Sequence, residues 1–206
     1  LIPTGAEEPI RVTGSVTGLG ETLMIAQSPV FTAPTVRSEM ALYALSATEE
    51  ERGRAAALLA GAVEGDTYAL NPADNDLLMH PLEQLGIKAL ADLEPGALSA
   101  GQARRLAVAR TLVRAEALYR AAKNGQDASM LTVLVDEPTA HLDAYSAYLV
   151  TRALYRLAEL GTTVLIVTHE GELATHCDTL VRAEEKDTDF SWSVAPNPAR
   201  VPIPTE

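Results

Sequence analysis

The stretch that decides the fold is Leu131-Thr-Val-Leu-Val-Asp136-Glu137-Pro138, an apolar run that ends in two adjacent carboxylates. A second apolar run, Thr163-Val-Leu-Ile-Val-Thr168-His169, ends in a polar pair, and a helical pattern over 144–160 separates the two runs. Continuous apolar strands joined through a helix are typical of parallel strands that are buried on both faces. Because ligands bind at the carboxyl edge of such sheets, we expect Asp136, Glu137 and His169 to lie at a binding edge.

The residue types at these strand ends suit phosphate chemistry. An aspartate such as Asp136 can hold Mg²⁺ directly or through water, and a glutamate such as Glu137 can polarise an attacking water. A histidine such as His169 can hydrogen-bond a phosphate oxygen or that water. Taken singly, each has a simpler reading: two solvated acids before a turn are equally compatible with the pattern, and a lone histidine is more often structural.

Two further candidate binding positions lie at the ends of predicted elements, one before a helix and one at the end of a strand. Leu98-Ser99-Ala100-Gly101-Gln102 precedes a helical pattern over 99–123, which Asn124-Gly125 is expected to end. Ser99 can cap that helix, and its free N–H groups with Gly101 can form an anion site. Gln27 ends a predicted strand over 21–27, where its amide could bind a metal or a water, although a lone glutamine is usually a surface residue.

The remaining segments are expected to frame this sheet. Residues 8–16 are predicted to form a strand that pairs with 21–27, and several short helices are expected between residues 35 and 86. A short strand is expected over 179–183. From Glu184 onward the acidic, proline-rich sequence predicts a tail, with Trp192 either docked on the domain or exposed.

Length and charge narrow the class of protein. The chain has 206 residues, 47% of them hydrophobic, which suffices for one domain or two small ones. A formal net charge of −12 opposes nucleic acid or anionic lipid as a general partner. The single cysteine, Cys177, fits a reducing compartment. The longest apolar stretches fall short of the roughly 18 residues that a membrane-spanning helix needs.

The order of the segments is more specific than any one of them. The series AQSP, LSAGQARRLAVARTLVR, LTVLVDEPTAHLD and VLIVTH, over roughly residues 8–183, resembles the ATPase domain of ATP-binding cassette (ABC) proteins. The resemblance implies an α/β fold: a P-loop NTPase-like core with a mostly parallel sheet and a helical subdomain. It makes Glu137 the catalytic glutamate, His169 the switch histidine and Gln27 the Q-loop glutamine that contacts Mg²⁺. Asp136 corresponds to the Walker B aspartate, a metal ligand. Ser99, Gly101 and Gln102 match the nucleotide-binding signature, in which Ala100 replaces the usual glycine, and Asp143 matches the D-loop aspartate.

The same resemblance implies cofactors and partners. Two such domains, identical or different, face each other head to tail and trap ATP and Mg²⁺ between them. In a transporter, ATP binding and hydrolysis are coupled to movement of a substrate by a transmembrane domain, here expected to be that of an exporter fused upstream. The domain would then lie on the cytoplasmic face of the cell membrane and would not bind nucleic acid.

The chain departs from the family pattern in its phosphate loop. No G-x-x-x-x-G-K-[ST] occurs, and none of the three lysines (Lys88, Lys123 and Lys186) follows a glycine-rich loop. Only 26 residues precede Gln27, so we expect that loop and the first strand to lie upstream of Leu1, and the 206 residues alone to be inactive. Residues 115–130, which join the signature helix to the Walker B strand, are more numerous than is usual in the family. The strand pair that the family has after the position of Leu180 is expected to be replaced here by the tail.

Shorter stretches of the sequence indicate which kind of ABC protein the chain resembles. Residues 28–42 resemble exporters, and LSAGQARRLAVAR with DEPTAHLD looks most like the heterodimeric bacterial exporters of cysteine and glutathione that support cytochrome bd assembly. An ABC ATPase of DNA repair or chromosome maintenance, and a non-catalytic regulatory half of a heterodimer, remain alternatives. The expected division is an ATPase core (1–34 and 111–183), a helical subdomain with the signature (35–110) and a tail (184–206).

Overall fold

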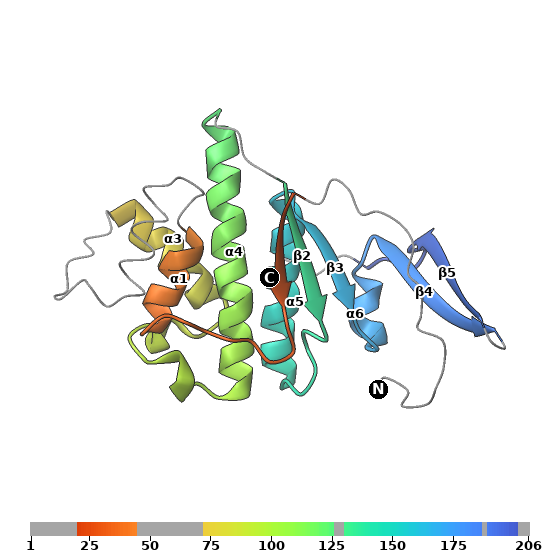
Figure 1. Ribbon diagram of the computed structural model, residues 1–206, viewed down its shortest axis with the longest axis horizontal. Coiled ribbons are helices and arrows are strands. Elements are labelled where there is room, and N and C mark those ends of the chain that lie inside the picture. Colours follow the sequence, from red (N-terminus) through yellow and green to blue (C-terminus); the bar gives the residue numbers. More distant parts are fainter. Residues whose placement is uncertain (1–19, 45–71, 126–129, 187–188, 202–206) are drawn as a thin grey trace, which may run out of the picture.

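A three-stranded parallel sheet forms the centre of the molecule. The computed structural model describes residues 20–44, 72–125, 130–186 and 189–201. Within them, β1 (Glu21–Ile25), β2 (Leu131–Asp136) and β3 (Thr163–Val167) lie in that order, all parallel (Figure 1). The two apolar runs therefore form neighbouring strands, as the sequence predicts, with the carboxylate-bearing strand between the other two.

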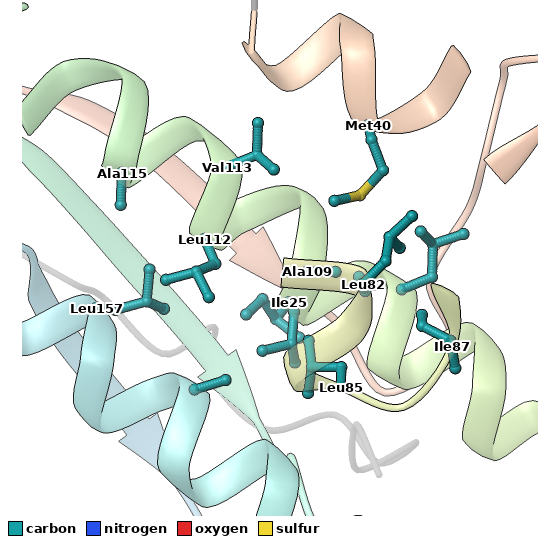
Figure 2. Close-up of a cluster of buried hydrophobic side chains, with 14 of the residues drawn as sticks. Ile25, Met40, Leu82, Leu85, Ile87, Ala109, Leu112, Val113, Ala115 and Leu157 are labelled. Atoms are coloured by element: carbon teal, nitrogen blue, oxygen red, sulfur yellow. The ribbon is translucent and has the colours of Figure 1, made fainter. Parts of the chain in front are cut away.

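Helices cover one face of this sheet. α4 (Ala100–Lys123) and α5 (Ala144–Glu159) bury their apolar sides with alternate residues of the strands, and Leu112 and Leu157 lie with Ile25 in this core (Figure 2). On the far side of α4, α1 (Val36–Ala44) adds Met40 and α3 (Pro72–Gln84) adds Leu82 to the same cluster, and Leu85, directly after α3, belongs to it too. The short 3₁₀ helices η1 (Lys88–Leu90) and η2 (Pro95–Ala97) connect α3 to α4. α4 thus joins the sheet to the helical region.

The opposite face of the sheet differs from the prediction that the strands are buried on both faces. Met24, Leu134 and Leu165 are register partners in one row across the sheet. Met24 is 58% exposed, Leu165 50% and Val167 62%. Period-2 alternation puts these residues on the face away from the helical core. The prediction of burial on both faces is therefore wrong for the described residues, because their helices pack against one face only.

The C-terminal region is also more regular than predicted. After α6 (Gly171–Thr175), β4 (Thr179–Lys186) and β5 (Asp189–Pro196) form an antiparallel pair. This hairpin contradicts two predictions. Residues 184–186 and 189–196 form strands and not a tail, and a strand pair is present after Leu180. Asn197, directly after β5, links the hairpin to the end of α6: its side-chain amide donates to the carbonyls of Ala174 (3.0 Å) and Cys177 (2.9 Å). Trp192 is 71% exposed.

The helix boundaries follow local chemistry. Ser99 caps α4 as predicted, and Gly125 (φ 74°) follows its C-cap Asn124 in the left-handed region that glycine tolerates. α4 is continuous across residues 110 and 111, so the predicted domain boundary falls inside a helix. The predicted strand over 8–16 lies outside the described residues, as do residues 45–71 of the helical insert. Among the helices that the structure describes, none has both the length and the apolar character to cross a membrane.

Candidate functional site

Three of the predicted site segments follow neighbouring strands and meet at one edge of the sheet. Gln27 comes after β1, Asp136 ends β2 with Glu137 directly following, and His169 comes after β3. Because the strands are parallel, their carboxyl ends point the same way, and α4 begins at that same end of the molecule (Figure 1). The fold therefore brings together the strand-end residues that the sequence singles out.

Glu137 and His169 form the closest contact of the site. His169 Nδ1 donates to Glu137 Oε1 at 2.7 Å, and the His169 backbone N–H donates to the same oxygen at 3.1 Å. Thr168 Oγ1 donates to the other oxygen, Oε2, at 3.2 Å. His169 is mostly exposed, whereas Glu137 is only one-fifth exposed. The Glu137 carboxylate is thus held by three donors, and the rest of the His169 ring faces solvent.

These contacts shift both pKa values in opposite directions. Partial desolvation raises the pKa of Glu137, but the hydrogen bonds from His169 and Thr168 and the charge of His169 together outweigh it, so the pKa lies below its ordinary value. The hydrogen bond to Glu137 and its negative charge hold the pKa of His169 above its ordinary value. Each charged form therefore stabilises the other, with Glu137 as the hydrogen-bond acceptor and His169 as the donor.

The backbone of Glu137 is held in an unusual conformation. Its φ is 45°, in the left-handed region that non-glycine residues rarely adopt. Its N–H donates to the Val167 carbonyl at 2.9 Å, and its own carbonyl accepts from Arg104 Nη1. Arg104 Nη2 also donates to the Gln27 carbonyl at 2.8 Å. Sequence reasoning assigned no role to Arg104, although it stands within the signature helix, because nothing in the sequence marks it as buried.

The donor set at the strand ends fits a magnesium ion held with a nucleotide. Mg²⁺ is bound by one or two carboxylates together with substrate phosphates, and it prefers oxygen ligands. Asp136 offers a half-buried carboxylate, and Gln27, one strand away, an exposed amide oxygen. In the described ranges, this site included, no group of three or more His, Cys, Asp or Glu residues could hold a metal ion. This is the arrangement expected of a metal that arrives with its phosphate ligand.

The signature residues form a helix cap. The Ser99 side chain accepts from the Gln102 N–H at 3.3 Å, and the Gln102 side chain accepts from the Ser99 N–H at 2.9 Å. These reciprocal bonds form a capping box, which directs the start of α4. A Cβ on Gly101 would stand 3.4 Å from Leu142 Cδ2, so the start of α4 lies against the turn before Asp143. Within the chain these residues do not contact the Glu137–His169 pair through any described hydrogen bond.

Asp143 has a defined local role. Its carboxylate accepts from the Ser146 N–H at 3.0 Å and caps α5. The hydrogen bonds from Ser146 hold the pKa of Asp143 below its ordinary value. Asp143 is therefore an ionised helix cap placed next to the start of α4.

A buried ion pair shapes the segment that follows Gln27. Glu39 on α1 accepts from the N–H groups of Thr32 (3.1 Å) and Ala33 (3.0 Å) and pairs with Arg110 of α4 at 2.6 Å. The Arg110 guanidinium also lies 5.0 Å from the centre of the Phe31 ring and donates to the Val30 carbonyl. Residues 27–33 are thus attached to α4 at both ends, by Arg104 and by Arg110.

The sequence is similar to known proteins over part of their length. No family profile matches the sequence. The chain is 38% identical over 118 residues to the macrolide export ATP-binding/permease protein MacB of Shewanella sp. strain ANA-3, covering 57% of this chain. It is 33% identical over 145 residues to MacB of Burkholderia pseudomallei strain 1710b, covering 70% of this chain. The matches span 15% and 16% of the length of these two relatives.

A solved structure supports the fold independently. The archaeal ribosome recycling factor aABCE1, in complex with the ribosomal stalk protein aP1, aligns with a TM-score of 0.51 over 87% of this chain and 28% of that chain, at 23% identity. At that identity the likeness concerns the fold alone. The sequence matches identify the chain as an ABC ATPase domain, homologous over part of its length to the macrolide export ATP-binding/permease proteins.

Proposed function

We propose that this domain binds and hydrolyses MgATP in a head-to-tail pair with a second ABC ATPase domain, and that hydrolysis drives export through a transmembrane domain. The observation that carries the proposal is the Glu137–His169 contact at 2.7 Å, next to Asp136 at the carboxyl edge of the sheet. A regulatory half without catalysis would have no chemical need for this pair.

Each strand-end group has a role that its environment supports. Asp136 and Gln27 would hold Mg²⁺, which supplies charge neutralisation at the phosphates when it is bound. Glu137 is a carboxylate at neutral pH and is held in place by its hydrogen bonds, so it can orient the attacking water and accept its proton. His169 is exposed and its pKa is raised, so it can turn and donate to the charge that develops on the transferred phosphoryl group.

The start of α4 supplies the second half of a composite site. A helix N-terminus carries unpaired N–H groups and a partial positive charge, which suit an anion. We therefore propose that Ser99, Gly101 and Gln102, with Asp143 beside them, contact ATP that is held mainly by the partner domain. This division explains why they make no described hydrogen bond to the Glu137–His169 pair. It also makes hydrolysis depend on dimer closure, and we expect the 206 residues alone to be inactive.

The membrane partner and the location come from the relatives. Both carry "export" and "permease" in their names, and the chain spans about a sixth of their length. We propose an exporter's permease domain as the partner, with this domain on the cytoplasmic face of the membrane. The relatives favour a macrolide exporter, whereas the finer resemblance to cysteine and glutathione exporters stays a prediction. Export is preferred to DNA repair because the net charge of −12 opposes nucleic acid.

The predicted organisation needs one adjustment under this proposal. We propose an ATPase core from residues 1–34 and 111–183 and a helical subdomain from 35–110. α4 belongs to both parts, since it runs without a break from Ala100 to Lys123. Its N-terminal half would carry the signature and its C-terminal half would pack on the sheet.

The test is Glu137→Gln in the full-length protein. We expect the hydrolysis rate to fall by a factor of about 10²–10⁴, the usual contribution of a positioned general base. MgATP affinity should remain within about threefold, since the amide preserves the shape of the side chain. Glu159→Gln is the control, because Glu159 lies on the surface of α5 in an exposed pair with Arg156. Unchanged turnover in Glu137→Gln would remove Glu137 from catalysis. Failure of ATP to drive uptake of a macrolide into inverted vesicles would overturn the macrolide assignment, and failure with glutathione and cysteine as well would overturn the export proposal.

A further inference from the structure

Arg104 connects two segments of the candidate site through their backbones. It lies in the second turn of α4 and is 7% exposed. Nη2 donates to the Gln27 carbonyl at 2.8 Å, and Nη1 donates to the Glu137 carbonyl. The planar guanidinium presents several donors in a fixed fork, so one side chain can hold two carbonyls at a set separation.

The neighbouring buried arginines of α4 behave differently. Arg110 pairs with Glu39 and Arg114 with Glu21, each at 2.6 Å, and both are about as buried as Arg104. In the part of the chain that the structure describes, Arg104 has no carboxylate partner and donates only to backbone carbonyls. A buried charge without an opposite charge is costly. Stability alone therefore does not explain an arginine at this position, whereas holding the two carbonyls does.

One of the two carbonyls belongs to the residue with the strained backbone. Glu137 has a φ of 45°, a conformation that persists only where the surroundings hold it. The bond from Arg104 to the Glu137 carbonyl and the bond from the Glu137 N–H to the Val167 carbonyl hold the two peptide groups on either side of the Glu137 Cα. The direction of the carboxylate, and hence its contact with His169, depends on that backbone conformation.

We propose that Arg104 is a positioning residue, which ties the backbone of Glu137 to that of Gln27 and so sets the direction of the Glu137 carboxylate. This inference rests on the proposed function for its effect on hydrolysis. Arg104 makes no described hydrogen bond to either side chain, so it acts through the backbone. A displacement of the Gln27 backbone would be passed to Glu137 through the same guanidinium.

The catalytic test compares Arg104→Met and Arg104→Lys with Arg114→Met in the full-length protein. Arg114 lies on the same helix and is equally buried, but its partner Glu21 stands at the opposite end of β1 from Gln27. We expect Arg104→Met to lower kcat by about tenfold to a hundredfold with KM for ATP within about twofold, because misplaced groups lose rate rather than ground-state binding. Arg104→Lys, which can reach one carbonyl, should recover part of kcat. Arg114→Met should lose stability but keep kcat.

A second measurement keeps this inference separate from the proposed function. In the ¹⁵N-labelled 206-residue chain, Arg104→Met and Arg104→Lys should move the amide resonances of Ser28, Glu137 and His169, which Arg114→Met should leave in place. If Glu137→Gln shows no effect on turnover but these resonances move, the proposed function fails and the positioning role stands. If the resonances stay in place, or if Arg104→Met and Arg114→Met lower kcat equally, the positioning role is overturned.

Discussion

Replacing Glu39 by alanine is the perturbation whose cost can be worked out most directly. Glu39 is 1% exposed, and both of its carboxylate oxygens are used. Oε1 lies 2.6 Å from Arg110 Nη1, and Oε2 accepts from the N–H groups of Thr32 and Ala33. Alanine leaves the buried Arg110 charge without its partner, and breaking a buried pair in this way costs about 3–5 kcal/mol.

The loss of the two backbone hydrogen bonds overlaps with this cost, so we expect a total of about 3–5 kcal/mol. That is a large part of the roughly 5–15 kcal/mol that a domain possesses. The assay is urea unfolding of the 206-residue chain, followed by circular dichroism, with the free energy of unfolding extrapolated to water. The matched control is Asp92→Ala. Asp92 pairs with Arg37 on the surface, where an ion pair contributes only about 0–1 kcal/mol.

A double variant tests the cause. If the unpaired charge dominates, Glu39→Leu with Arg110→Met should recover much of the lost stability, because a buried ion pair can be replaced by apolar residues of similar volume. The reasoning is refuted if Glu39→Ala costs less than about 1 kcal/mol, or if Asp92→Ala costs as much.

Two further predictions concern the strand-end pair and the two faces of the sheet. Because the pKa of His169 is raised in the folded state, its contribution to stability is fully present below the unfolded-state pKa and is lost as pH rises through the folded-state pKa. The pKa of Glu137 is lowered in the folded state, so its contribution is lost as pH falls through that folded-state pKa. An NMR titration should therefore place the pKa of His169 above 6.5, and Glu137→Gln should return that pKa toward 6.5. If the variant leaves the pKa of His169 unchanged, Glu137 is not the cause of the shift. Val133→Ala, on the buried face, should cost about 1.5–3 kcal/mol in urea unfolding, and Leu165→Ala, half exposed on the other face, about 1 kcal/mol or less. If both substitutions lower the free energy of unfolding equally, the sheet face that carries Leu165 is not solvent-exposed.

Local patterns predicted the elements with clear boundaries. The apolar runs became β2 and β3, Ser99 capped α4 and Gly161 (φ 83°) followed α5. The hairpin of β4 and β5 was missed because the acidic residues and prolines from residue 184 onward predicted a tail. The strand signal was present, since Phe190, Trp192 and Val194 alternate with polar residues. The open sheet face was missed for a related reason: an apolar run predicts a buried strand but cannot say which helices cover it.

The sequence by itself determined the family, the order of the strand-end residues and the chemistry available to Asp136, Glu137 and His169, because residue type and spacing are local properties. Only the tertiary structure decided how these residues are held. The 2.7 Å contact between Glu137 and His169 joins residues 32 positions apart, and the link from Arg104 to Gln27 spans 77. Such contacts depend on strand order and helix packing, since a side chain's partners are fixed only when distant segments come together.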